Sequence, residues 1–225
     1  MKVLVIPDVH LKPWIFDDAQ FILKHFNLDK VIFIGDLVDD WNKENYIDLY
    51  KDTIDRAMLF KLQNKTSIFC YGNHEVAYIL GEQCSGNSEL YRPMIQTMLN
   101  QYERTVEPVI AAKIDNVIFS HAGIAKSYVT DYRIENIDNV KLSIAYSDLN
   151  SPLWVRPDPW VSFFNDYIQV VGHTPVKYIQ QINGIWVTDT FSTNSDNSIY
   201  GNQTFMSIDT ITGEITLYKN RKIVR

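Results

Sequence analysis

Four of the five histidines in the chain stand directly after short apolar runs, and carboxylate and amide side chains accompany them. Imidazole, carboxylate and amide oxygen, without thiolate, suit first-row ions such as Mn²⁺, Fe or Zn²⁺ better than a structural zinc site with cysteine ligands. A lone histidine is more often a surface or core residue, so the prediction of a metal site depends on the joint pattern. The residues in this pattern are Asp8, His10, Asp36, Asn73, His74, His121 and His173.

The spacing and number of these side chains predict a site for two ions. Asp8 and His10 are two residues apart, so extended backbone would place both side chains on the same side. Two divalent cations carry four positive charges, of which Asp8, Asp36 and a bridging hydroxide would remove three. The remaining charge attracts phosphate, and such a pair of ions can generate the hydroxide that attacks phosphorus in line. The predicted chemistry is phosphoester hydrolysis.

Strands that alternate with helices are expected to position these residues. Apolar runs of four or five residues are typical of strands buried on both faces. Helical periodicity covers residues 45–64 and 91–102, and His25 lies in an amphipathic stretch over residues 19–26 as an ordinary helix residue. This alternation predicts an α/β fold in which ligands bind beyond the carboxyl ends of the strands. The expected strands are residues 2–6, 31–34, 67–70, 117–119, 168–171, 184–190 and 204–219, the last broken by a turn at Thr212-Gly213.

Length and composition limit the alternatives. The 225 residues are 46% hydrophobic and 21% charged, which predicts one folded domain over residues 1–225 and excludes intrinsic disorder. A net charge of -6 provides no dedicated nucleic-acid surface, and no apolar run approaches the ~18 residues of a membrane span. The protein is therefore expected to be soluble and cytoplasmic. Cys70 and Cys84 are too few to staple the fold and are expected to be free thiols.

Five motifs in order along the chain carry a specific resemblance to a known family. They are Asp8-Val9-His10, Gly35-Asp36-Leu37-Val38-Asp39, Gly72-Asn73-His74-Glu75, His121-Ala122-Gly123 and Gly172-His173. The chain resembles the calcineurin-like metallophosphoesterase superfamily, and within it the bacterial and bacteriophage serine/threonine branch of the phosphoprotein phosphatases. The resemblance implies an αββα sandwich, with two central mixed sheets flanked by helices.

The resemblance also implies a role for each matching residue. It makes His74 the general acid that protonates the leaving oxygen, held by Asp39, although Asp39 could instead cap a helix start. Glu75 is interpreted as a structural acid in the first turn of a short helix closed by Gly81. Two divalent ions are implied, with Mn²⁺ preferred to Fe, Zn²⁺ or Ni²⁺. The first ion would bind Asp8, His10 and Asp36, and the second Asp36, Asn73, His121 and His173, so that Asp36 bridges them.

Departures from the family pattern concern the substrate. Pro175 stands where other branches of the superfamily carry a further histidine, which favours the phosphoprotein phosphatase pattern. Asp40-Trp41 and Tyr71 occupy positions where the family usually has arginine, so two phosphate-binding cations are missing. Arg156 is the best remaining phosphate ligand, or else a surface ion pair. The side chains of Trp41, Trp154 and Trp160 could line a cleft or belong to the core.

Three functions remain open from the sequence. The leading one is a dinuclear-metal-dependent phosphomonoesterase that acts on phosphorylated protein, peptide or a small phosphoester, with a metal-bridging hydroxide as nucleophile. A nucleotide or dinucleoside polyphosphate hydrolase is the alternative, because such enzymes share these motifs. A non-catalytic scaffold on the same fold is disfavoured, since every expected ligand is present.

Overall fold

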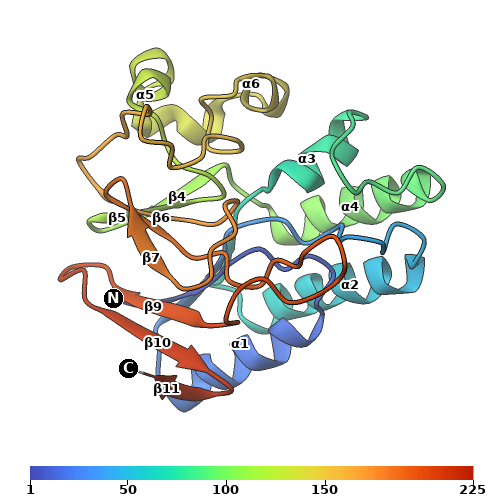
Figure 1. Ribbon diagram of the computed structural model, residues 1–225, viewed down its shortest axis with the longest axis horizontal. Coiled ribbons are helices and arrows are strands. Elements are labelled where there is room, and N and C mark those ends of the chain that lie inside the picture. The colour runs from blue at the N-terminus through green and yellow to red at the C-terminus, as the bar shows by residue number, and fades with distance from the viewer. Residues whose placement is uncertain (225) are drawn as a thin grey trace.

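The computed structural model describes residues 1–224, which form two β-sheets packed face to face (Figure 1). Within these residues the first sheet has the strand order β11-β10-β9-β1-β2-β3, and the second has the order β4-β5-β6-β8-β7. The first sheet consists of β1 (Lys2–Ile6), β2 (Lys30–Phe33), β3 (Ile68–Phe69), β9 (Phe205–Asp209), β10 (Ile215–Lys219) and β11 (Lys222–Val224). The second consists of β4 (Ala111–Ile114), β5 (Val117–Ser120), β6 (Ile168–Val171), β7 (Gln180–Ile182) and β8 (Ile185–Val187).

Helices cover the outer faces of both sheets. Figure 1 shows α1, α2 and α4 together on one side of the molecule, and α5 and α6 on another. No helix in residues 1–224 is both long enough and apolar enough to cross a membrane. The helices are α1 (Trp14–His25), α2 (Ile47–Gln63), α3 (Asn73–Leu80), α4 (Arg92–Val106), α5 (Lys126–Tyr132), the 3₁₀ helix η1 (Ile134–Asn139) and α6 (Leu142–Ser147).

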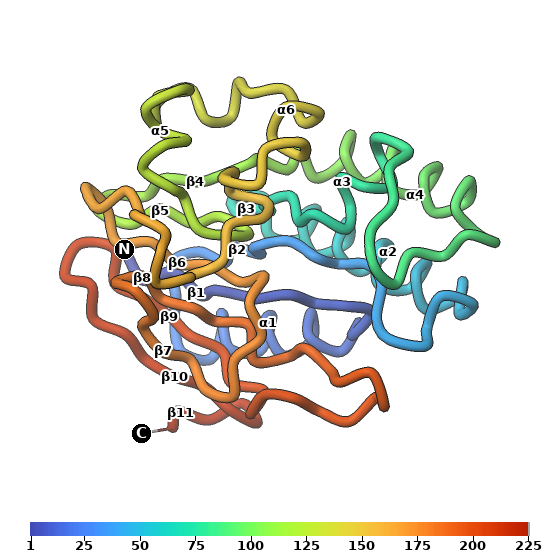
Figure 2. The backbone as a smooth tube through the Cα atoms, turned by 45° about the horizontal axis from the view of Figure 1, so that its top comes forward, coloured from blue at the N-terminus to red at the C-terminus, as the bar shows by residue number. Residues whose placement is uncertain are grey.

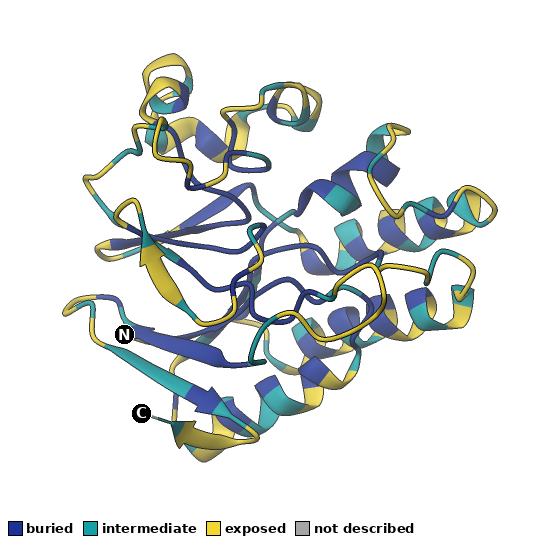
Figure 3. Ribbon diagram, viewed as in Figure 1, coloured by how far each residue is buried: buried dark blue, intermediate teal, exposed yellow. Residues whose placement is uncertain are grey.

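The alternation of side chains in β1 explains the layers. Leu4 and Ile6 pack against the helical layer of α1, α2 and α4, whereas Val3 and Val5 face the second sheet. The opposite face of the second sheet packs against α5, η1 and α6. Buried strands therefore occupy the middle of the molecule and exposed residues its outside (Figure 3). This arrangement is the expected αββα sandwich.

Both sheets are mixed, and their parallel strands lead to one edge. β1, β2 and β3 run parallel, as do β5, β6 and β8. β9 pairs antiparallel with β1, with Val3 opposite Ile208, so segments far apart in sequence lie side by side (Figure 2). The connections that follow the parallel strands carry the polar residues of the motifs.

Most predicted elements are confirmed to within a few residues. The helix expected over residues 45–64 is α2, and the one expected over residues 91–102 is α4, which continues to Val106. Only β8 forms within the strand expected over residues 184–190. No periodic pattern predicts β4, β7, β11, α5, η1 or α6, because each is too short to establish a repeat.

Candidate metal centre

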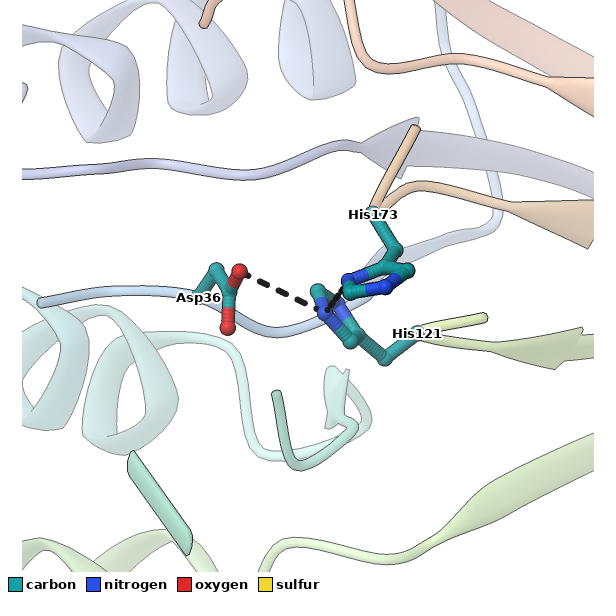
Figure 4. A group of neighbouring side chains, drawn as sticks. All are labelled: Asp36, His121 and His173. Atoms are coloured by element: carbon teal, nitrogen blue, oxygen red, sulfur yellow. Dashed lines mark hydrogen bonds and ion pairs between the residues drawn. The ribbon is translucent and has the colours of Figure 1, made fainter. Parts of the chain in front are cut away.

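Two groups of aspartate and histidine side chains could each hold a metal ion, and they share one residue. One group is Asp8, His10 and Asp36, and the other is Asp36, His121 and His173. Within each group the potential ligand atoms lie within 4.8 Å of one another. Figure 4 shows that the side chains of the second group come from three separate segments and converge. The structure therefore brings together residues that the sequence assigns to one metal site.

Distances within the second group fit a common cation. His121 Nε2 lies 3.3 Å from Asp36 Oδ2 and 3.0 Å from His173 Nδ1. Asn73 Oδ1 lies 2.8 Å from the same nitrogen. Two donors that are each about 2.1 Å from one ion are about 3.0 Å apart when they subtend a right angle. The Asn73 oxygen is thus close enough to join the group.

Backbone carbonyls orient two of the histidines. His10 Nδ1 lies 2.9 Å from the Asp39 carbonyl oxygen, and His121 Nδ1 lies 2.9 Å from that of Ile34. A carbonyl can only accept, so in each ring the proton belongs on Nδ1 and the Nε2 lone pair is free to bind a cation. The donor chemistry of these residues fits divalent metal ions.

The convergence arises from tight turns and not from strand alternation. His10, Asp36 and His173 have φ angles of 43°, 51° and 60°, in the left-handed region. The explanation that Asp8 and His10 project to one side of extended backbone is therefore wrong, although the two residues do meet. The Asp36 carbonyl accepts the N–H of Val9 at 2.9 Å and of His10 at 2.8 Å. The turns after β1 and β2 are joined by these two bonds.

Glu75 holds the turn that carries Asp36. Its carboxylate accepts backbone N–H groups from Asp36 at 2.9 Å, Leu37 at 2.5 Å and Val38 at 3.2 Å. It also accepts the Gly72 N–H at 2.9 Å, at the start of α3. α3 ends at Gly81 in the left-handed conformation, with φ of 77°. Glu75 therefore joins three consecutive residues around Asp36 to the first turn of a helix.

Burial and the charges of neighbouring side chains shift the pKa values of the aspartate and histidine residues in these groups. Burial would raise the pKa of Asp36, but His121 and His74 hold it well below its usual range. Burial would lower the pKa of His121, yet Asp36 and Asp8 raise it to about 9. Burial and the nearby Asp189 raise the pKa of Asp8 well above its usual value. A bound cation would favour the ionised form of Asp8 and the neutral form of His121.

His74 and Asp39 form a close pair beside the two groups. His74 Nδ1 lies 2.7 Å from Asp39 Oδ2, and both residues line the same cleft. Burial would lower the pKa of His74, but Asp36 and the Asp39 hydrogen bond raise it well above its usual value. Tyr46, and not Asp39, occupies the N-cap position of α2, so the alternative that Asp39 caps this helix is wrong.

The cleft over these residues is small and has aromatic walls. It encloses about 190 Å³ and is lined by Trp41, Trp154 and Arg156, among others. The Arg156 side chain is exposed and makes no ion pair within residues 1–224, which removes the surface ion-pair alternative. Trp160 is 91% exposed and lies outside this cleft. The idea that Trp160 lines the cleft or belongs to the core is therefore wrong.

The residues that stand where the family usually has arginine supply no free cation to the cleft. The Asp40 carboxylate pairs with Lys12 Nζ at 3.1 Å and accepts the Thr193 hydroxyl. The Tyr71 hydroxyl donates to Glu103 at 2.7 Å. Lys12 is thus neutralised by Asp40.

The sequence reasoning missed several residues near the site. Asp189 lies two positions after β8 and lines the cleft, so the pattern of polar residues after apolar strands would also have indicated it. Its carboxylate accepts from the backbone and hydroxyl of Ser192. Tyr50 lies in the helix expected over residues 45–64, and its hydroxyl donates to Asp39, a contact that periodicity does not indicate. Asn87 and Cys84, on the loop after α3, gave no signal in the sequence.

Known proteins share this architecture. A sequence profile described as calcineurin-like phosphoesterase matches residues 1–201. No curated protein is a significant match to the chain. A cold-active protein tyrosine phosphatase solved at 1.1 Å aligns with a TM-score of 0.62 at 16% identity, over 96% of this chain and 75% of that one. The corresponding phosphatase of a psychrophilic Shewanella species gives 0.60 at 17% identity, over 96% and 77%. At such identities the likeness is one of fold.

Proposed function

The chain belongs to the calcineurin-like phosphoesterase family, and on that premise we propose that it is a metal-dependent phosphomonoesterase of the serine/threonine phosphatase kind. The observation that carries the proposal is the sharing of Asp36 by two groups of potential ligands beside the His74–Asp39 pair. In this proposal residues 1–225 act as a single catalytic domain. The substrate is a phosphorylated protein, a peptide or a small phosphoester.

Six side chains would hold two divalent ions. Asp8, His10 and Asp36 would bind the first, and Asp36, Asn73, His121 and His173 the second. Mixed oxygen and nitrogen donors without thiolate suit first-row ions, and we propose Mn²⁺, with Fe, Zn²⁺ or Ni²⁺ as the alternatives. When bound, such ions polarise phosphoryl oxygens and lower the pKa of water.

The remaining steps use the side chains of this chain. His74 would give the proton on Nε2 to the leaving oxygen, while Asp39 keeps hold of the proton on Nδ1. Arg156, exposed at the cleft, would bind a nonbridging phosphate oxygen through its planar guanidinium.

Nucleotide hydrolysis is the second candidate, and one observation favours it. Trp41 is 46% exposed and lines the cleft together with Trp154, so a flat base has aromatic surface to pack against. A turnover comparison between a phosphoserine peptide and a diadenosine polyphosphate separates the two candidates.

The first test is activity on a panel of phosphoesters. Purified protein is stripped of metal with a chelator and assayed with and without added Mn²⁺. We expect hydrolysis of phosphomonoesters that depends on the ion. Protein that binds Mn²⁺ but is inert toward every phosphoester would instead favour a non-catalytic role.

A leaving-group comparison tests the role of His74. A general acid matters most for a poor leaving group, so His74→Asn should impair hydrolysis of phosphoserine far more than that of an activated aryl phosphate. General acid catalysis contributes ~10²–10⁴-fold, which sets the expected loss on the alkyl ester. Asp39→Asn should show a weaker form of the same selectivity. Equal losses on both esters, together with lower metal content, would make His74 a metal ligand.

A further inference from the structure

The Asp39 carboxylate is the centre of a hydrogen-bond network that extends beyond its pair with His74. Its Oδ1 accepts the hydroxyls of Tyr50 at 2.7 Å and Tyr78 at 2.8 Å. Its Oδ2 accepts Asn87 Nδ2 at 2.7 Å besides His74 Nδ1. Both oxygens thus have two donors each.

The two tyrosines can act only as donors to this carboxylate. Burial, followed by the Asp39 charge, raises the pKa of Tyr50 far above its usual range, and the same causes raise that of Tyr78. Neither hydroxyl therefore ionises at neutral pH. Because donors approach each oxygen separately, rotation of the carboxylate about its Cβ–Cγ bond would break bonds on both sides. The direction in which Oδ2 faces His74 is fixed.

The same network reaches the rim of the cleft. The Asn87 Oδ1 atom accepts the Cys84 N–H at 2.6 Å, and the Tyr78 hydroxyl accepts the Ser88 N–H at 2.6 Å. Cys84 and Gly86 of this loop line the cleft. The loop after α3 is thereby connected to the carboxylate that holds His74.

We propose that Tyr50, Tyr78 and Asn87 are positioning residues that hold Asp39, and through it His74, in the orientation needed to donate a proton to the leaving oxygen. This inference rests on the proposed function, since it concerns the same phosphoester site. It adds that the site is built for esters with poor leaving groups, for which the position of a proton donor decides the rate.

A purely structural role for the network makes a different prediction. If the hydroxyls only stabilise the core, their removal should lower stability and affect all substrates alike. If they position His74, their removal should impair alkyl esters selectively. Tyr50→Phe tests this most cleanly, because it removes one hydroxyl and leaves Tyr78 as a donor to Oδ1. Asn87→Ala is the second variant, since it removes a donor from the other oxygen.

Tyr218→Phe is the matched control. Tyr218 is 2% exposed, and its hydroxyl lies 2.9 Å from Ser207 Oγ, between strands of the first sheet and outside the cleft. For Tyr50→Phe and Asn87→Ala we expect kcat on a phosphoserine peptide to fall about tenfold, a part of the ~10²–10⁴-fold due to a general acid. On p-nitrophenyl phosphate we expect a loss of roughly twofold or less. Tyr218→Phe should leave both rates unchanged.

A second measurement does not depend on activity. In protein loaded with Zn²⁺, which is diamagnetic, the hydrogen-bonded Nδ1 proton of His74 is followed by proton NMR and assigned by its loss in His74→Asn. We expect this signal to broaden or shift in Tyr50→Phe and Asn87→Ala and to stay unchanged in Tyr218→Phe. If the wild-type protein hydrolyses neither ester, the proposed function fails, and the NMR comparison still decides whether the network positions His74. An unchanged signal, or equal losses on both esters while His74→Asn remains selective, would overturn the inference alone.

Discussion

Replacing Glu75 by glutamine should loosen the metal centre without touching a proposed metal ligand. The carboxylate accepts four backbone N–H groups, and three of them belong to the turn from Asp36 to Val38. Glutamine keeps one oxygen but places an NH₂ group where the other oxygen stood. That NH₂ group can only donate, so the backbone N–H groups that it faces lose their acceptor.

The size of the effect follows from the bonds lost. Each carboxylate oxygen accepts two of the four backbone bonds, so glutamine loses at least two. A hydrogen bond to a charged group contributes ~1.5–3 kcal/mol, which gives a loss of about 3–6 kcal/mol in the free energy of unfolding. Domains are stable by only ~5–15 kcal/mol in total. The variant should fold, but with much of its stability gone and with the Asp36 turn loosened.

Urea denaturation at pH 8 measures this effect. Burial and the Asp36 charge raise the pKa of Glu75 to about 7, so at pH 8 the carboxylate is ionised. Glu103→Gln is the control, because the Glu103 carboxylate accepts one bond from the Tyr71 hydroxyl, and we expect it to cost about 1 kcal/mol. Mn²⁺ affinity, measured by titration calorimetry, should fall in Glu75→Gln only. An unfolding free energy equal to that of Glu103→Gln would refute the view that Glu75 anchors the Asp36 turn.

Three further predictions concern the metal ions, the substrate and pH. Asp36→Asn should lower the metal content found by elemental analysis and abolish hydrolysis while circular dichroism stays that of the wild type; full activity after chelator treatment would exclude a shared ligand. Arg156→Lys should keep the charge but lose bidentate binding, so kcat/KM should drop about tenfold or more at unchanged metal content. Wild-type kinetics in Arg156→Ala would show that Arg156 does not bind the phosphate. In metal-stripped protein the pKa of His121 is raised to about 9, against ~6.5 in the unfolded chain. The ion pair of protonated His121 therefore stabilises the fold fully below pH ~6.5, and this stabilisation is lost as pH rises through 9. The melting temperature of stripped protein should fall between these pH values while Mn²⁺ affinity rises, because the bound ion displaces that proton; a rising melting temperature would contradict the charge assignment.

The convergence of the proposed ligands was predictable because its signal is local. Each proposed ligand follows an apolar run, and the end of a strand can be recognised from a few residues. That these ends meet follows from the parallel topology of β1, β2, β5 and β6. The geometric reason for the Asp8–His10 approach was wrong, because left-handed φ angles such as that of His10 are set by contacts between turns.

The network around Asp39 could not be predicted in the same way. Tyr50 lies in the helix expected over residues 45–64 and Tyr78 in the short helix that ends at Gly81, and both side chains are buried. Whether a buried tyrosine hydroxyl meets a carboxylate depends on how α2 and α3 pack near Asp39, which spacing along the chain does not encode. The exposure of Trp160 could not be predicted either. A large apolar side chain can be buried or exposed, and which of the two holds depends on the conformation of its loop.

The pairing of β1 with β9 has a consequence for folding during synthesis on the ribosome. Val3 pairs opposite Ile208, so some 200 residues must be synthesised before β1 gains its neighbour on that side. At ~5–20 residues per second, this edge of the nascent sheet stays open for roughly 10–40 s on the ribosome. The open edge is an apolar strand with unpaired backbone groups, which is a template for association with other chains. Ribosome-bound chains that stop before residue 205 should therefore recruit chaperones, and release of the β9 segment from the exit tunnel should end that dependence.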